Sequence, residues 1–118
     1  KPWLPVPDIH RAMAVDTQQG HEGSVYDFYR DFLEFRRNNS PLVKGSIDFL
    51  DTPPGVVAYI RADGGEKLLC AFNLGHEPAE FATGLSVTRL EEAPLDGVAD
   101  DAGNVKLEAL GGFIGRVR

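Results

Sequence analysis

The sequence has little cysteine, no long apolar run and no excess of positive charge. Its 118 residues include a single cysteine, so no disulfide can form within the chain. The longest apolar runs, Val56 to Ile60 and Leu68 to Phe72, have about five residues, against the roughly 20 that cross a bilayer. The 12 Lys and Arg stand against 18 Asp and Glu, a formal net charge of −6. Nucleic acid and anionic membranes attract basic surfaces, so we expect a soluble protein with neither as a partner.

The single cysteine, Cys70, lies inside an apolar run, which is typical of a small buried side chain rather than of a nucleophile. With no disulfide to indicate an oxidising compartment, cytoplasm and periplasm both stay open. The chain starts at Lys1 and continues with three prolines in residues 2–7, without the basic and apolar regions of a signal peptide. We expect residues 1–7 to form an extended arm and the chain to be part of a longer protein.

One amphipathic helix is predicted, beginning after Ser24 and extending to about Asn38. Before it, residues 8–23 show no sustained periodicity, and the polar stretch 16–23 is typical of a surface loop. The Ser24 hydroxyl can accept a hydrogen bond from the backbone N–H of Asp27 and so cap the helix. Apolar residues then recur at helical spacing, and they comprise Val25, Phe28, Tyr29, Phe32, Leu33 and Phe35. Such a wide aromatic face needs a substantial partner to pack on.

After Pro41 the pattern changes to short β-branched and aromatic runs separated by turn residues. We predict strands over 43–50, 56–61, 67–74 and 105–110. Glycines in 62–66 predict a hairpin turn between the second and third runs, and residues 52–55 join the first and second. About seven or eight short strands at this spacing favour an antiparallel β-sandwich.

The runs around Val56 and Leu68 are apolar on both faces. A strand covered on two sides fits either an element packed outside the sandwich or contact with a neighbouring domain. Alternation predicts two one-sided sets, Leu68, Cys70, Phe72 and Leu74 on one strand and Val105, Leu107 and Ala109 on another.

The candidate metal ligands lack the spacing of a metal site. The histidines fall in the arm, the polar loop and a turn, where no two share a face: His10, His21 and His76. An oxygen-rich loop comprises Asp96, Asp100, Asp101 and Asn104. In that loop Val98 occupies a position where a calcium-binding loop needs an oxygen ligand. The loop also lacks a Glu at the position where it would coordinate the ion. We predict a solvated turn, with no metal and no cofactor.

Patterns for catalysis are also missing. Glu91 and Glu92 are adjacent, so on a strand their carboxylates would point to opposite faces and could not act as an acid/base pair. The glycines of 111–115 lack phosphate-binding spacing and predict a β-turn or bulge. Residues 38–40 match the N-glycosylation acceptor, a pattern short enough to arise by chance. We expect Trp3 to anchor the arm rather than to bind a sugar, and we predict no catalytic residue in the chain.

Four stretches resemble the C-terminal end of α-glucosidases and oligo-1,6-glucosidases of glycoside hydrolase family 13, the α-amylase family. They are PWLPV (2–6), SVYDFYR (24–30), LEFRRNNSPLVKGS (33–46) and EKLLCAFNL (66–74), and with their spacing they span residues 2–75. The resemblance implies that residues 1–41 form an extended arm plus the last helix of an otherwise absent TIM barrel. It also implies that residues 42–118 form the C-terminal β-sandwich domain of such enzymes.

The same resemblance implies that the family's catalytic residues, an Asp nucleophile, a Glu acid/base and a second Asp, precede Lys1. The chain would then be a non-catalytic part of a retaining α-glucosidase acting on maltose- or isomaltose-type oligosaccharides. Its partners would be its own upstream (β/α)8 barrel and, only through that barrel, an α-gluco-oligosaccharide. Without the barrel, the helix face of Phe28, Phe32 and Phe35 would be partly uncovered and could drive self-association. Two alternatives stay open, an accessory carbohydrate-binding module and a generic Ig-like interaction domain.

Overall fold

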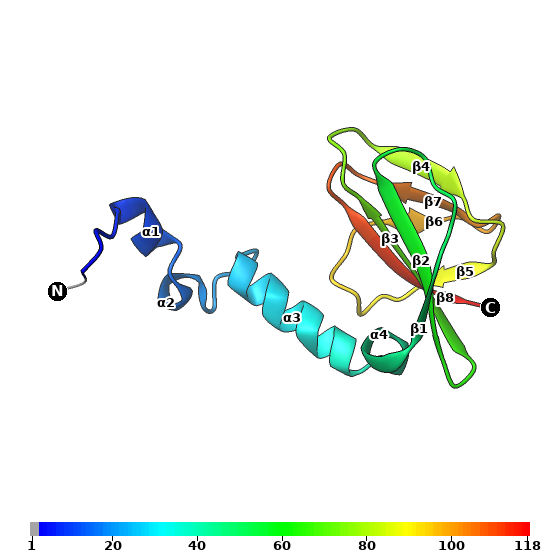
Figure 1. The fold of residues 1–118 in the computed structure, drawn as a ribbon, viewed down its shortest axis with the longest axis horizontal. Helices are drawn as coiled ribbons and strands as arrows, with labels where there is room; N and C mark the ends of the chain where they lie inside the picture. Colours follow the sequence, from blue (N-terminus) through cyan, green and yellow to red (C-terminus); the bar gives the residue numbers. More distant parts are fainter. Residues whose placement is uncertain (1–2) are drawn as a thin grey trace. The chain divides into compact units, whose positions relative to one another are not determined.

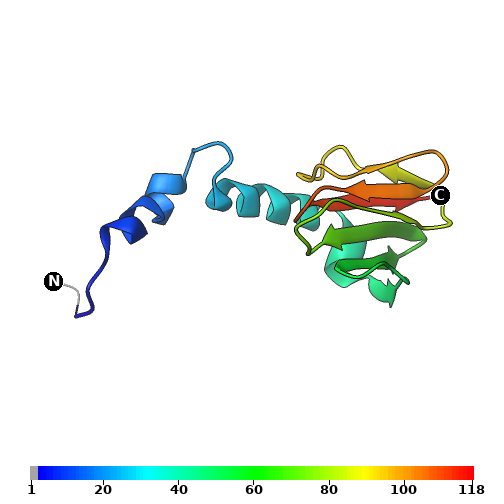
Figure 2. The ribbon, with the colours of Figure 1, turned by 90° about the horizontal axis from the view of Figure 1, so that it is seen from above.

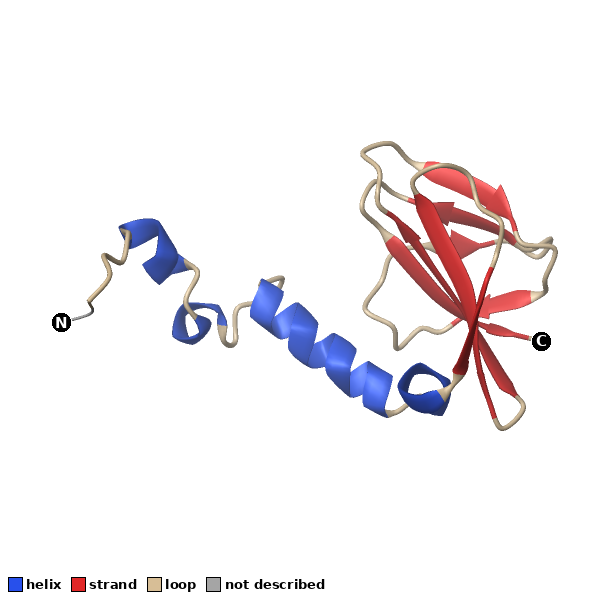
Figure 3. Ribbon diagram, viewed as in Figure 1, coloured by secondary structure: helices blue, strands red, loops and turns tan. Residues whose placement is uncertain are grey.

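Helices occupy the first third of the chain and strands the remainder (Figure 3). The computed structural model describes residues 3–118. The chain divides into two compact units, one ending at Glu34 and the other comprising Phe35–Arg118. The first unit contains α1 (Asp8–Ala12), α2 (Val15–Gln18) and most of α3 (Val25–Arg37), which crosses the division.

The helices α1 and α2 occupy a segment for which the sequence predicted no regular structure. They have five and four residues, too few to display a 3.6-residue period, so periodicity could not reveal them. Side chains hold them locally, since the Thr17 hydroxyl donates to the carbonyl of Arg11 at 2.8 Å and the Gln18 amide donates to that of Met13 at 2.6 Å. Neither helix buries a residue.

The helix α3 is the predicted amphipathic helix, and its predicted cap is confirmed. The N–H of Asp27 donates to the Ser24 hydroxyl oxygen at 3.1 Å, which satisfies one of the free donors of the first turn. Asp27 lies in the first turn, and Arg36 and Arg37 lie in the last, as the helix dipole favours. The aromatic face is not uniform along the helix, because Phe35 is buried while four other apolar side chains are exposed: Val25, Phe28, Tyr29 and Leu33.

Two antiparallel sheets form the second unit (Figures 1 and 2). The larger has the order β1 (Ser46–Phe49), β2 (Val56–Asp63), β3 (Glu66–Asn73), β8 (Gly112–Val117) and β5 (Val87–Arg89). The smaller has the order β4 (Ala79–Ala82), β7 (Asn104–Leu107) and β6 (Val98–Ala99). The predicted class, a mainly β antiparallel sandwich preceded by an amphipathic helix, is confirmed.

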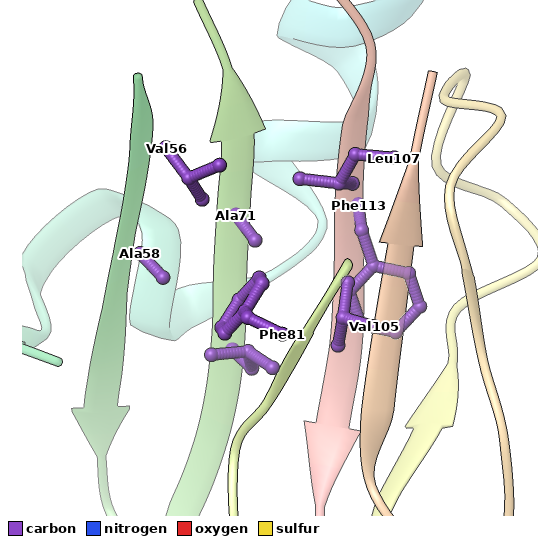
Figure 4. Close-up of a cluster of buried hydrophobic side chains, with 8 residues drawn as sticks. Val56, Ala58, Ala71, Phe81, Val105, Leu107 and Phe113 are labelled. Carbon is purple, nitrogen blue, oxygen red and sulfur yellow. The ribbon is translucent and has the colours of Figure 1, made fainter. Parts of the chain in front are cut away.

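The inner core lies between the two sheets (Figure 4). The larger sheet contributes Val56, Ala58, Leu69, Ala71 and Phe113, and the smaller contributes Phe81, Val105 and Leu107. Each leucine or phenylalanine buried here stabilises the fold by roughly 1.5–3 kcal/mol relative to an exposed side chain. All eight residues of this core belong to the second unit.

The predicted hairpin between β2 and β3 is confirmed. Asp63 pairs with Glu66 across the turn, and the two residues between them, Gly64 and Gly65, have φ values of 57° and 89°. Two consecutive positive φ values are what a tight turn between right-twisted strands requires, and glycine adopts them without steric cost. Residues 52–55 likewise join β1 to β2, as predicted.

The strand predicted over 43–50 is wrong at its beginning. A short helix, α4 (Ser40–Lys44), occupies that place and β1 starts only at Ser46. Pro41, after which the change of pattern was placed, lies in the first turn of α4. Proline is favoured there, because its fixed φ suits a helix and its missing N–H would have no partner in the helix.

The glycine-rich segment predicted as a turn or bulge is instead β8, a strand inside the larger sheet. A Cβ on Gly112 would lie 2.9 Å from the Phe72 ring, and one on Gly115 would lie 2.6 Å from the Phe113 ring. These glycines therefore make room for aromatic rings within a regular strand. The strand predicted over 105–110 is shorter than expected, because β7 ends at Leu107.

Candidate functional site

The outer face of the larger sheet, turned away from the inner core, is buried over one half. Pairing aligns Tyr59, Cys70 and Ile114 across β2, β3 and β8, and these residues alternate with those of the inner core. Cys70 and Ile114, together with Leu68, are nevertheless at most 2% exposed. The helix α4 contacts β2 and β3. The buried residues of α4 are Pro41 and Leu42.

Cys70 lies on this buried half, and its chemistry is that of a structural thiol. Burial raises the pKa of Cys70 from 9.0 to about 12, and the nearby Arg61 opposes that rise. At neutral pH the group is a neutral thiol, which is a poor nucleophile. The structure therefore gives Cys70 a packing role.

The other half of the outer face carries three aromatic side chains in a row, which we name the aromatic row: Phe49 on β1, Tyr59 on β2 and Phe72 on β3. Phe49 pairs directly with Tyr59, and their ring centroids lie 5.7 Å apart at an interplanar angle of 68°. Tyr59 and Phe72 follow at 6.3 Å and 39°. Phe49 is 70% exposed, while the other two are partly buried. Partial burial is the main reason that the pKa of Tyr59 is raised, so its hydroxyl is un-ionised at neutral pH.

Two adjoining surface hollows, of about 380 and 440 Å³, lie beside β5 and share four lining residues: Thr88, Arg89, Glu91 and Arg118. The Arg118 guanidinium donates to the Thr88 hydroxyl at 3.0 and 2.7 Å. Arg89 donates to the carbonyl of Leu95 at 2.7 Å. Both guanidinium groups are thus engaged in the fold itself, and the hollows mix acidic and basic groups.

The acidic loop predicted as a solvated turn is held together by one carboxylate. Asp100 Oδ1 accepts hydrogen bonds from the N–H groups of Ala102 and Asn104, both at 2.9 Å. Its Oδ2 accepts a third, from the Asn104 side-chain amide. The bonds from Asn104 are the main reason that the pKa of Asp100 is lowered. This carboxylate therefore satisfies donors of its own loop.

The remaining candidate side chains lie apart from one another. His10 belongs to α1, whereas His21 and His76 lie in connecting segments, and all three are exposed. Among residues 3–118, His, Cys, Asp and Glu do not gather in groups of three that could hold a metal ion. Glu91 and Glu92 occupy a turn after β5 rather than a strand. That Glu91 and Glu92 do not act as an acid/base pair stays a prediction.

Two further predicted features have simple environments. Trp3 is 90% exposed, so its expected anchoring has no receiving surface within the part of the chain that the structure describes. The 38–40 triplet follows α3, where Asn38 is exposed and the Asn39 amide donates to the carbonyl of Phe35 at 2.8 Å.

The aromatic row is the feature that sequence reasoning missed. Alternation correctly placed Phe72 on one face of its strand with Leu68 and Cys70, but nothing local showed that this face points away from the inner core. The pair Ile47 and Phe49 could have indicated it. Apolar residues two apart on an edge strand lie on the same face, and such a face is apolar rather than suited to solvent.

Comparisons with known proteins show that the chain is similar to one part of several sugar-processing enzymes. It is 40% identical over 122 residues to a probable alpha-glucosidase of Rhizobium meliloti, covering 98% of the chain and 21% of that protein. It is 33% identical over 82 residues to an oligo-1,6-glucosidase of Bacillus cereus, covering 69% of the chain and 15% of the enzyme. No family model matches the chain.

Solved structures agree with these relatives. A crystal structure of an alpha-glucosyl transfer enzyme superposes with a TM-score of 0.90 at 36% identity, covering 100% of the chain and 22% of the enzyme. An isomaltulose synthase mutant from Erwinia rhapontici gives a TM-score of 0.82 at 25% identity and also covers 22% of that enzyme. The chain thus spans about a fifth of the length of the proteins it matches.

Within the described residues, the helices are too short and too polar to cross a membrane.

The chain is a homologue of one part of the α-glucosidases and oligo-1,6-glucosidases of glycoside hydrolase family 13, as its four motifs predicted. Its mainly β fold is consistent with the C-terminal domain of these enzymes.

Proposed function

We propose that this chain is the non-catalytic C-terminal part of a retaining α-glucosidase, a member of the family to which its sequence and fold are similar, and that it supports the enzyme's barrel. The observation that carries the proposal is the nearly complete match of the chain to about a fifth of a probable alpha-glucosidase. In this proposal residues 1–41 are the arm and last helix of the barrel, and residues 42–118 are the terminal sandwich.

The whole enzyme would hydrolyse terminal α-glucosidic bonds in maltose- or isomaltose-type oligosaccharides. A retaining mechanism needs a nucleophilic carboxylate and an acid/base carboxyl about 5–5.5 Å apart. In a (β/α)8 enzyme these groups lie at the C-terminal ends of the barrel strands. They would therefore precede this chain, whose own contribution is to hold the barrel.

Hydrolysis of a chromogenic α-glucoside tests whether catalysis resides outside this chain. We expect the 118-residue chain to give no turnover, and the polypeptide encoded by the whole gene to give saturable hydrolysis. Saturable hydrolysis by the chain alone would contradict the non-catalytic assignment. An inactive whole-gene product would contradict the assignment of the parent enzyme.

Glucosyl transfer is a second candidate reaction for the parent, favoured by the match to an alpha-glucosyl transfer enzyme. Both reactions can pass through a covalent glucosyl-enzyme intermediate, which is released to water in one case and to a sugar hydroxyl in the other. Product chromatography of the whole enzyme with maltose separates them, since hydrolysis yields glucose alone and transfer also yields longer or rearranged saccharides.

An accessory sugar-binding role for the chain has one observation in its favour, the exposed ring of Phe49. The angle of 68° between that ring and Tyr59 argues against it, because rings at this angle do not form a flat platform for a sugar face. Titration with maltose, followed by Trp3 fluorescence and by the NMR signals of Tyr59, decides between the roles. Saturation in the millimolar range would favour the sugar-binding module.

A further inference from the structure

The two sheets of the sandwich present opposite kinds of outer surface. On the smaller sheet, exposed Glu80 on β4 pairs with exposed Lys106 on β7, an opposite-charge pair of the type found on sheet faces in water. The uncovered half of the larger sheet instead carries the aromatic row together with Ile47 and Val57. The outer face of the smaller sheet thus mixes charged residues with one exposed valine, Val98, whereas the uncovered half of the larger sheet is mainly apolar.

The exposure of this half is concentrated at its edge. Every residue of β1 is exposed, with Ile47 at 51% and Phe49 at 70%. An exposed edge strand with apolar side chains is a liability unless another part of the protein covers it. The adjacent half of the same face shows what such cover achieves, because Leu68 and Cys70 are each 1% exposed beside α4.

We propose that the uncovered half, centred on the aromatic row, is the surface on which the sandwich docks against the barrel of its own polypeptide. This inference rests on the proposed function and assigns a specific surface to it. The relatives carry nearly four-fifths of their length outside the matched region, so their sequences contain a body large enough to cover the row.

The size of the row favours a covalently attached partner over a second copy of the chain. A stable complex of separate proteins usually buries about 800 Å² on each side. Three aromatic side chains bury at most about 150–250 Å² each, and two of these three are already partly buried. Attachment in one chain makes docking intramolecular, and the resulting high effective concentration lets a small patch suffice.

The test compares one substitution in two contexts. Phe49→Ser is made in the 118-residue chain and in the polypeptide encoded by the whole gene, and thermal unfolding of the sandwich is followed in both. Val98→Ser is the matched control, since Val98 is an apolar strand residue of the smaller sheet that is 46% exposed. The whole-gene wild type is also assayed for α-glucosidase activity.

We expect Phe49→Ser to lower the melting temperature of the 118-residue chain by a few °C, because the ring loses its contact with Tyr59, and to lower that of the whole-gene product by more. Val98→Ser should give no larger shift in the whole-gene product than in the 118-residue chain. The inference is overturned if Phe49→Ser, like this control, gives no larger shift in the whole-gene product. It is likewise overturned if the 118-residue chain forms a dimer that Phe49→Ser abolishes, or if maltose binding perturbs the row.

Failure of the inference and failure of the proposed function give different results. An active whole-gene enzyme with equal Phe49→Ser shifts refutes the docking surface and leaves the enzyme assignment intact. A whole-gene product without α-glucosidase or glucosyl-transfer activity, or a reading frame without a barrel, refutes the proposed function and this inference with it.

Discussion

Alanine substitution of two neighbouring leucines in β3 tests whether this strand is buried on both faces. Leu69 points into the inner core and is 0% exposed, whereas Leu68 points to the outer face and is 1% exposed. Each substitution removes three carbon atoms, which costs about 2–2.5 kcal/mol in transfer free energy. The cavity left behind adds to this, so we expect each variant to lose about 2.5–5 kcal/mol of unfolding free energy.

Urea denaturation followed by far-UV circular dichroism measures both losses on the 118-residue chain. Ile47→Ala is the control, because this side chain is 51% exposed and should lose less than about 1 kcal/mol. Leu68 lies on β3, which α4 contacts. A loss below about 1 kcal/mol for Leu68→Ala, beside a large loss for Leu69→Ala, would refute the burial of the outer face at Leu68.

Two further predictions concern single sites in the sandwich. Because the pKa of Cys70 is raised to about 12, stability should be fully present below pH 9 and fall as the pH rises from 9 toward 12, and iodoacetamide should label native Cys70 far more slowly than a free thiol at pH 8. Rapid labelling without unfolding would contradict this burial. Gly97→Ala should destabilise the chain by about 1–3 kcal/mol, since the new Cβ would lie 2.6 Å from the Gly112 carbonyl oxygen. A neutral effect in urea denaturation would show that the backbone there yields readily.

Elements specified by nearby residues were predictable from the sequence. The amphipathic helix combines a capping serine, a regular apolar period and oppositely charged ends, and each of these acts within one or two turns. The β2–β3 hairpin is specified by two glycines at the positions that need positive φ. Such local devices require no knowledge of what the element later packs against.

Elements specified by distant contacts were not predictable in the same way. The strand β8 contains Gly112 and Gly115, which lower strand propensity, and their purpose appears only when the rings of Phe72 and Phe113 are in place. The helix α4 depends on Pro41, a residue that ends one helix as readily as it begins another. Its Leu42 is buried, so packing on β2 and β3 selects the helix.

The candidate surface illustrates the same limit. A period of two reveals which residues share a face, so Phe72 was correctly grouped with Leu68 and Cys70. Whether that face is the inner or the outer one depends on which strands lie opposite, namely β4, β7 and β6. The sequence could therefore predict an apolar face but could not place it outside the core.

Several charged side chains of the second unit are hydrogen-bonded within the fold itself. Arg61 donates to the carbonyls of Gly45 and Ser46 at 3.0 and 2.9 Å, and Arg89, Asp100 and Arg118 likewise bond to groups of the fold. A hydrogen-bonded guanidinium or carboxylate that secures backbone is costly to recruit for chemistry, because moving it leaves its partner unsatisfied. These polar groups thus form hydrogen bonds within the sandwich, whereas the exposed surface around the aromatic row is apolar.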